Sequence, residues 1–192
     1  IITKEVGQHQ IWAAQQFEYK APRTLISSGG LGTMGYGLGA AIGAKVANPN
    51  KTVFNIAGDG SFGMNCNEFA TAVKYNIPIK IIGLNNNALG MVRQWQNLFY
   101  EARYSQTTLD RATDFVKLAE AFGGVGFRVE KREDLDTVLT EAIAVDKPVI
   151  IDYRIHCDKM VFPMVAPGKA IDEIINELVK SIEDKENKLK SL

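Results

Sequence analysis

The stretch NIAGDGSFGMN, residues 55–65, places an acidic side chain, Asp59, between two glycines directly after an apolar run. Glycine-rich turns after buried strands often receive phosphate groups, because glycine lets backbone amides approach the ligand closely. A carboxylate at that position would repel a phosphate. A hard divalent cation removes the conflict, since it takes oxygen ligands from both groups. The stretch therefore predicts a strand, a tight turn and a cation-assisted phosphate site.

Short apolar runs rich in β-branched residues alternate with helical patterns on both sides of this stretch. The runs cover residues 24–26, 52–57, 79–84, 126–129 and 149–155. The helical patterns cover residues 35–47, 67–75, 114–122, 134–144 and 171–180. This alternation is typical of a parallel sheet covered by helices. We expect an α/β fold with a three-layer, open parallel sheet and helices on both faces.

Several polar residues mark the expected helix starts. Asn65 with Glu68 three residues on is a variant of the capping box, and Asp114 and Asp134 are suited to N-cap positions. Residues 100–111 and the segment FPMVAPGKA, residues 162–170, are expected to be loops because they lack periodicity or contain proline and glycine.

Composition limits the class of protein. The 192 residues are 46% apolar and carry 22 basic and 22 acidic side chains, which gives no overall field for nucleic acid or an anionic membrane surface. Cys66 and Cys157 lack metal-binding or redox spacing, so we expect buried thiols and a cytoplasmic protein. One domain is expected over residues 1–182, followed by a charged, disordered tail at 183–192.

Glycine-rich or polar residues follow three of the predicted strands. These strand exits read SSGGLGTMG (27–35), AGDGS (57–61) and NNNALG (85–90). In an open parallel sheet, ligands bind outside the carboxyl ends of the strands, where connections diverge to opposite faces. The three exits are therefore expected to meet at one binding site.

Asp59 and Asn86 are 27 positions apart, which leaves room for one helix and one strand and would place both on the same rim of the sheet. Carboxylate, amide and carbonyl oxygens together with phosphate suit a six-coordinate Mg²⁺. Local alternatives stay open at each exit: a tight turn at the glycines, an Asx-turn at Asp59 and an ordinary polar turn at residues 85–87.

The GDG motif followed at this interval by NN resembles the thiamine diphosphate-binding motif of thiamine-dependent enzymes. Over residues 6–176 the chain resembles the C-terminal domain of the acetohydroxyacid synthase (acetolactate synthase) catalytic subunit. The segments that carry this resemblance are VGQHQIWAAQQF, SGGLGTMGYGLGAAIGAKVANP, GDGSFGMNCNEFATAV, LGMVRQWQNLFYEARYS and VFPMVAPGKAIDEII. The resemblance implies a transferase of branched-chain amino-acid biosynthesis. Such an enzyme decarboxylates pyruvate and ligates the hydroxyethyl unit to a second pyruvate or 2-ketobutyrate.

The resemblance also implies roles for individual residues. The Mg²⁺ ligands would be the side chains of Asp59 and Asn86 and the carbonyl of Ala88. The residues expected to contact the diphosphate are Gln8, His9, Gly60 and Ser61.

Two further sets follow from the same resemblance. The Gly32 carbonyl and the Met34 amide would hold the aminopyrimidine, and the Met34 side chain would support the bent shape of the cofactor. Met91 would border both the cofactor and the substrate channel, and Trp95 would help to choose 2-ketobutyrate. Helical spacing of Met91 and Trp95 is also typical of core packing, and a histidine near a helix start is often a capping or core residue. His156 has no counterpart and is expected to be structural.

The implied site is composite. The family's activating glutamate lies in an N-terminal domain and acts across a subunit interface, and its FAD-binding domain is also outside this sequence. No catalytic residue is therefore expected in this chain, which alone should bind cofactor weakly and turn over no pyruvate. The resemblance implies a homodimer or tetramer of the full-length subunit and allows for a regulatory subunit. No nucleic-acid or membrane partner is expected.

Departures from the family pattern are modest, and two other functions stay open. Gly39 stands where proline is usual, and Cys66 and Asn67 replace commoner residues. One alternative is another thiamine-dependent decarboxylase or oxidase, such as pyruvate oxidase or benzoylformate decarboxylase, against which Trp95 argues. The other is a binding or dimerisation module, including a nucleotide-binding domain suggested by GGLGTMG.

Overall fold

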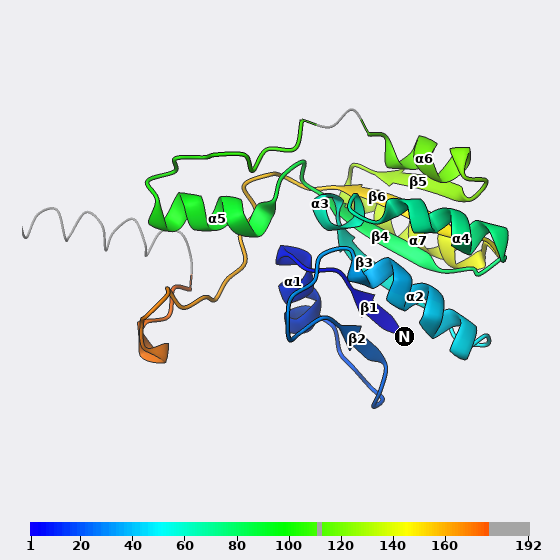
Figure 1. The fold of residues 1–192 in the computed structure, drawn as a ribbon, viewed down its shortest axis with the longest axis horizontal. Helices are drawn as coiled ribbons and strands as arrows, with labels where there is room; N and C mark the ends of the chain where they lie inside the picture. Colours follow the sequence, from blue (N-terminus) through cyan, green and yellow to red (C-terminus); the bar gives the residue numbers. More distant parts are fainter. Residues whose placement is uncertain (111–112, 177–192) are drawn as a thin grey trace, which may run out of the picture.

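A parallel sheet forms the centre of the computed structural model, which describes residues 1–110 and 113–176 (Figure 1). Its strands are β1 (Ile2–Lys4), β2 (Leu25–Ser27), β3 (Phe54–Gly58), β4 (Lys80–Asn85), β5 (Val125–Val129) and β6 (Val149–Arg154). Every strand pair is parallel, and the spatial order is β2-β1-β3-β4-β6-β5. The predicted α/β class is confirmed.

The helices connect these strands or extend beyond them. They are α1 (Gln8–Gln16), α2 (Tyr36–Ala47), α3 (Asp59–Phe62), α4 (Phe69–Lys74), α5 (Gly90–Phe99), α6 (Phe115–Ala121) and α7 (Leu135–Ala144). Short 3₁₀ turns are η1 (Cys66–Glu68), η2 (Arg132–Asp134) and η3 (Ile171–Glu173). Figure 1 shows α5 and the segment that follows β6 standing away from the layered part, on the same side of it.

The strand register explains why both faces of the sheet are buried. One row across β1, β3, β4 and β6 consists of Thr3, Asn55, Ile81 and Ile150. This row faces α2, α4 and α6, whose apolar side chains share a core with it. The adjacent row, which includes Ile151, packs against α7 in a second core. Helix α1 lies on that second face, where Lys4 Nζ donates to the Gln10 carbonyl. The three-layer arrangement follows.

The ends of the five predicted strands agree with those in the structure to within two residues. It missed β1, which is three residues long and too short to show an alternating pattern. The predicted N-cap at Asp114 is confirmed, because its carboxylate accepts hydrogen bonds from the amides of Val116 and Lys117. The loop predicted at residues 162–170 is also confirmed, with an isolated bridge at Met164.

Two predicted caps are wrong. Asn65 makes no cap bond, because its side-chain amide donates to the Gly35 carbonyl, while Glu68 accepts from Asn67 and Thr71 instead. Asp134 also caps nothing with its side chain, since it is the last residue of η2 and has helical backbone angles. An N-cap residue needs extended angles to reach the following amides.

The helix predicted over 171–180 is wrong in its described part. Only the turn Ile171–Glu173 is helical there, and Ile174 has extended backbone angles. Ile175 then exchanges two backbone hydrogen bonds with Met164. The remainder of that prediction, the domain limit at 182 and the tail at 183–192 lie outside the described residues. The two thiols are free and half-buried rather than fully buried.

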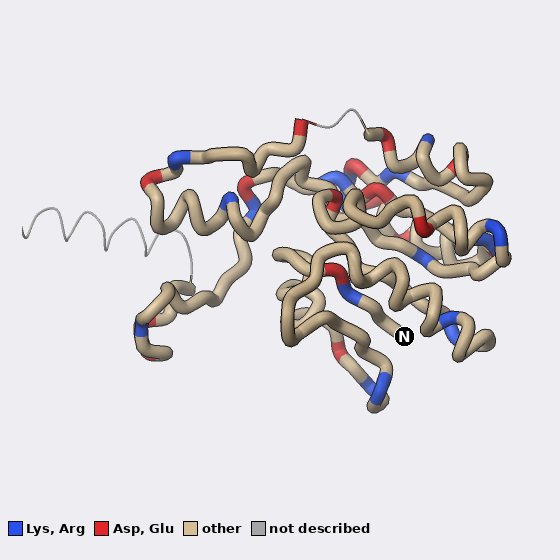
Figure 2. Tube along the Cα trace, viewed as in Figure 1, with Lys and Arg blue, Asp and Glu red and all other residues tan. Residues whose placement is uncertain are grey.

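Charge is distributed in both signs along the chain (Figure 2), in keeping with the equal numbers of acidic and basic residues. Within residues 1–110 and 113–176, none of the helices has the length and apolar character needed to cross a membrane.

The strand order sets the position of the site. The chain leaves β1, forms β2 on one side of it and then crosses to β3 on the other side. The connections therefore diverge between β1 and β3, and a crevice opens above the carboxyl ends of these two strands.

Candidate functional site

A cavity of about 240 Å³ opens at the carboxyl ends of β1, β3 and β4, at the point where the connections diverge. Its wall contains all the residues predicted to bind metal or cofactor: Gln8, His9, Gly32, Met34, Asp59, Gly60, Ser61, Asn86, Ala88 and Met91. The three strand exits thus meet as expected. The roles of these residues as ligands stay predictions.

Asp59 and Asn86 lie side by side because their strands are neighbours. Gly58 of β3 pairs with Leu84 of β4, so each residue follows its strand at the same rim. The backbone amide of Asn86 donates a hydrogen bond to Asp59 Oδ1 over 3.4 Å, and both residues are buried. Asn86 Oδ1 accepts from the Ala88 backbone amide at 3.1 Å, so an Asx-turn forms at Asn86, where the sequence suggested only an ordinary polar turn as the alternative. The three residues predicted to bind the metal, Asp59, Asn86 and Ala88, therefore lie together in the cavity wall.

His9 is held against two glycines at the start of α1. A Cβ added to Gly58 would lie 2.7 Å from His9 Nδ1, and one added to Gly7 would lie 2.7 Å from Cε1. Burial lowers the pKa of His9 to about 3, although a hydrogen bond with the Glu5 backbone acts in the opposite direction. His9 is therefore a neutral imidazole at neutral pH. Its buried Nε2 has no hydrogen-bond partner among the described residues.

Gln8 is fixed by partners that the sequence did not reveal. Its Nε2 donates to Gln94 Oε1 and to the Lys159 carbonyl, each at 2.9 Å. These two acceptors orient the amide, so its Oε1 is the atom that lacks a partner within the described chain. A Cβ on Gly90 would collide with that oxygen, so glycine is required at this close approach.

Gln94 joins three segments through one side chain. Its Oε1 accepts from Gln8 and from the Val161 amide, and its Nε2 donates to the Val161 carbonyl at 2.8 Å. Gln94 is 3% exposed, so these bonds are buried. The start of α1, helix α5 and the segment after β6 are therefore held together beside the cavity.

Ser61 belongs to a second buried network. Its hydroxyl accepts from the Gly35 amide at 3.1 Å and donates to Glu5 Oε2 at 2.8 Å. Glu5 Oε1 in turn accepts from the Leu38 amide at 2.9 Å. Gly35 has a φ of 81°, a left-handed conformation that favours glycine. Glu5 could not be recognised as a site residue from the sequence, because a single acidic residue after a short strand carries no recognisable pattern.

The predicted substrate residues separate along α5. Met91 lines the cavity, whereas Trp95 is not among the described residues of its wall. Trp95 lies one turn further on, 38% exposed, with its ring edge-on to Phe99 at 5.6 Å. The structure brings Met91 to the cavity and places Trp95 beyond it.

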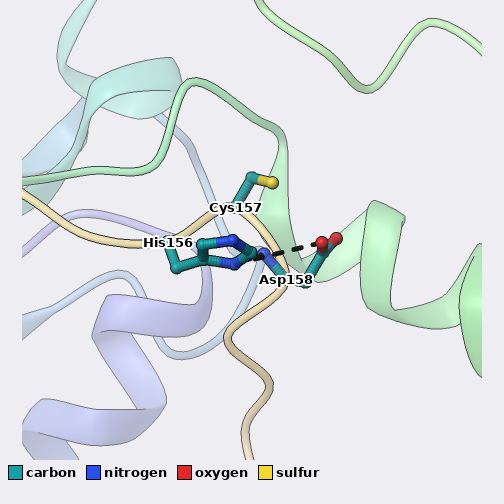
Figure 3. A group of neighbouring side chains, drawn as sticks. All are labelled: His156, Cys157 and Asp158. Carbon is teal, nitrogen blue, oxygen red and sulfur yellow. Dashed lines mark hydrogen bonds and ion pairs between the residues drawn. The ribbon is translucent and has the colours of Figure 1, made fainter.

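His156, Cys157 and Asp158 form a small cluster after β6 (Figure 3). The Asp158 carboxylate pairs with Arg93 at 2.8 Å, and His156 Nδ1 accepts from the Asp158 amide at 3.2 Å. Arg93 also stacks over the Tyr104 ring at 3.8 Å. The ion pair between Arg93 and Asp158 fastens the segment after β6 to α5, and the structural role expected for His156 stays a prediction.

Several known proteins are similar to this chain in sequence. The chain is 52% identical over 176 residues to the mitochondrial acetolactate synthase catalytic subunit of Saccharomyces cerevisiae. The aligned region covers 92% of this chain and 26% of that protein. It is 53% identical over 174 residues to an acetolactate synthase of Mycobacterium bovis, covering 88% and 28% respectively. It is 46% identical over 178 residues to the acetolactate synthase isozyme 2 large subunit of Escherichia coli, covering 93% and 32%. The chain thus spans about a quarter to a third of the length of these curated relatives.

A broader family match covers most of the part of the chain that builds the cavity. Residues 5–153 match the family described as thiamine pyrophosphate enzyme, C-terminal TPP binding domain. That range contains the exits of β1, β2, β3 and β4 and every residue predicted to bind the cofactor or its metal. The chain therefore belongs to the C-terminal TPP-binding domain family of thiamine pyrophosphate enzymes.

Proposed function

We propose that the chain is the diphosphate-binding domain of an acetolactate synthase catalytic subunit and that it binds thiamine diphosphate together with Mg²⁺. The observation that carries the proposal is the wall of the cavity, where residues from separate strand exits meet and where two buried polar atoms at the start of α1 have no hydrogen-bond partner among the described residues. The names of the relatives support the choice of enzyme within the family.

The residues present fit the cofactor. His9 Nε2 and Gln8 Oε1 are buried at the cavity without partners in the described chain, and burying a polar atom unpaired costs about 1–3 kcal/mol. A ligand with polar groups would remove that cost. Gly58 and Gly90 leave the wall open at the points where any side chain would collide with His9 or Gln8.

The metal would be held by the Asp59 carboxylate, the Asn86 amide oxygen and the Ala88 carbonyl, a donor set suited to Mg²⁺. Gln8, His9, Gly60 and Ser61 would surround the diphosphate, and Gly32 with Met34 would hold the pyrimidine. When bound, thiamine diphosphate supplies the electron sink that allows a 2-keto acid to lose CO₂. The described residues position the reactants and exclude water, which lowers the entropic part of the barrier.

The proposed reaction is decarboxylation of pyruvate and transfer of its two-carbon unit to a second pyruvate or to 2-ketobutyrate. The activating glutamate, FAD and a second subunit would come from outside the 192 residues.

Calorimetry with thiamine diphosphate tests the binding proposal. The complete polypeptide that contains this chain should bind the cofactor in the presence of Mg²⁺ and ignore NAD. Asp59→Asn should weaken binding at least tenfold, because the amide lacks the charge that Mg²⁺ prefers. Asp136→Asn, on the exposed face of α7, is the matched control and should bind as the parent does.

Two outcomes contradict the proposal at different levels. Preference for NAD over thiamine diphosphate would remove the cofactor assignment. Retention of the cofactor with acetaldehyde as product, or acetyl phosphate when phosphate is supplied, would keep the cofactor and replace the synthase by a decarboxylase or oxidase.

A further inference from the structure

Glu5 is a fully buried carboxylate that the proposed reaction does not use. It follows β1 directly, has 0% exposure, and its two oxygens accept hydrogen bonds from different parts of the chain. Burying a carboxylate is costly unless it is hydrogen-bonded, so both bonds are needed where they are. We infer that Glu5 is a positioning residue of the cofactor site, which holds Ser61 and the start of α2 in binding geometry. The inference rests on the proposed cofactor.

The first contact concerns the Ser61 hydroxyl. That hydroxyl donates its one hydrogen to Glu5 Oε2 and accepts the Gly35 amide. A hydroxyl has a single hydrogen to donate, so it cannot also donate to a diphosphate oxygen in this arrangement. Ser61 therefore serves the site through the placement of its backbone on the GDGS turn. Glu5 fixes that placement.

The second contact concerns helix α2. Its N-cap residue, Gly35, has no side chain to cap the first turn, and Glu5 Oε1 accepts the Leu38 amide in its place. A negative charge at a helix N-terminus is stabilised by the unpaired amides and the helix dipole. The bond anchors the end of the loop that carries Gly32 and Met34. A Cβ on Gly37 would lie 3.0 Å from Glu5 Cδ, so the helix packs directly on the carboxylate.

The backbone of Glu5 adds a third connection. Its amide donates to the Ile56 carbonyl of β3, and its backbone also hydrogen-bonds His9. One residue thus links the exits of β1, β2 and β3, which supply most of the cavity wall. Loss of the carboxylate is expected to loosen two of these exits together.

A double-mutant cycle tests the inference in the complete polypeptide, with affinity for thiamine diphosphate and Mg²⁺ as the readout. Glu5→Gln keeps the size of the side chain, but its amide nitrogen cannot accept a hydrogen bond, so either the Leu38 amide or the Ser61 hydroxyl loses its acceptor. Glu5→Gln and Ser61→Ala should each raise the Kd about tenfold, the range seen when a residue behind a binding group is lost. The double variant should bind the cofactor no more weakly than the weaker-binding single variant, because the two substitutions break the same chain of contacts.

Thr3→Val is the matched control. Thr3 is equally buried on β1 and donates toward the Gly37 carbonyl and Asn55, but it does not reach Ser61. This variant should lower the Tm and leave the Kd unchanged. Affinity is measured at a temperature where every variant is folded, so a merely structural role of Glu5 would lower its Tm without coupling to Ser61.

The outcomes separate the two proposals. If the parent binds no thiamine diphosphate, the proposed function fails before Glu5 is considered. If the parent binds, additive losses in the double variant overturn the role of Glu5. Should Glu5→Gln not fold, unchanged affinity in Ser61→Ala overturns it equally, since Glu5 is inferred to act through that hydroxyl.

Discussion

His9 couples the stability of the domain to pH. Its pKa falls from an ordinary 6.5 to about 3 through burial, so between these values the unfolded chain binds a proton that the folded chain does not. Stability therefore decreases as pH falls through that window. At pH 5 the expected loss relative to pH 7 is about 2 kcal/mol, from 1.36 kcal/mol for each pH unit below 6.5. Denaturant unfolding of the cofactor-free protein between pH 7 and pH 4.5 measures it.

The two histidines allow a matched comparison. His9→Gln should flatten the dependence of unfolding free energy on pH between 4.5 and 6.5, where the carboxylates paired with arginine are still ionised. His156→Gln is the control, because the His156 side chain is 71% exposed. An equal flattening in both variants would show that the burial of His9 is not the cause.

Single residues also mark the limit of sequence reasoning. Asp59 and Asn86 could be placed on one rim in advance, because the strand-end rule needs only chain order and spacing. Glu5 and Gln94 could not, since their partners are distant in sequence and reach them only through the packing of helices on the sheet. Buried polar networks of this kind leave no periodic trace.

At the scale of elements, the aspartates at the starts of α6 and α7 are expected to contribute differently to the unfolding free energy. Asp114 accepts from the first-turn amides of α6 and pairs with Arg128 at 2.6 Å, whereas Asp134 makes no cap bond. Asp114→Ala should lower the unfolding free energy by about 1–2 kcal/mol, the usual cost of losing an N-cap. Asp134→Ala should change it by less than about 0.5 kcal/mol.

Chemical denaturation of both variants measures this difference. A similar loss in the two would mean that charge at the helix start, and not the hydrogen bonds of Asp114, provides the stability. Because none of the described residues of the cavity wall belongs to α6 or α7, cofactor affinity should stay the same in each variant.

Elements with strong periodicity or several apolar residues were predictable, and those set by pairing were not. The central strands had β-branched runs long enough to be recognised. Near the end of the chain, isoleucines at helical spacing predicted a helix, yet Ile175 pairs with Met164 in an isolated bridge. A tertiary contact there overrides local propensity, which is a weak guide for short segments.

At the scale of the whole molecule, the chain should be incomplete as a catalyst. Among the described residues of the cavity wall, Asp59 is the only one with an acidic side chain, and the proposal assigns that side chain to Mg²⁺. The 192 residues alone should release no CO₂ from pyruvate, while the complete polypeptide should do so with Mg²⁺ and thiamine diphosphate present. A CO₂-release assay on both proteins at equal molar concentration measures this, and turnover by the 192-residue chain would contradict it.

The cavity wall is drawn from residues as far apart as Val6 and Ile155, each delivered by a different strand. A peptide cut out around GDGS would keep Asp59 but lose the histidine, the asparagine and the glycines opposite. Grafting the motif onto a foreign scaffold would fail for the same reason. The binding site cannot be separated from the sheet, so transferring it to another protein requires the strand order as well as the GDGS motif.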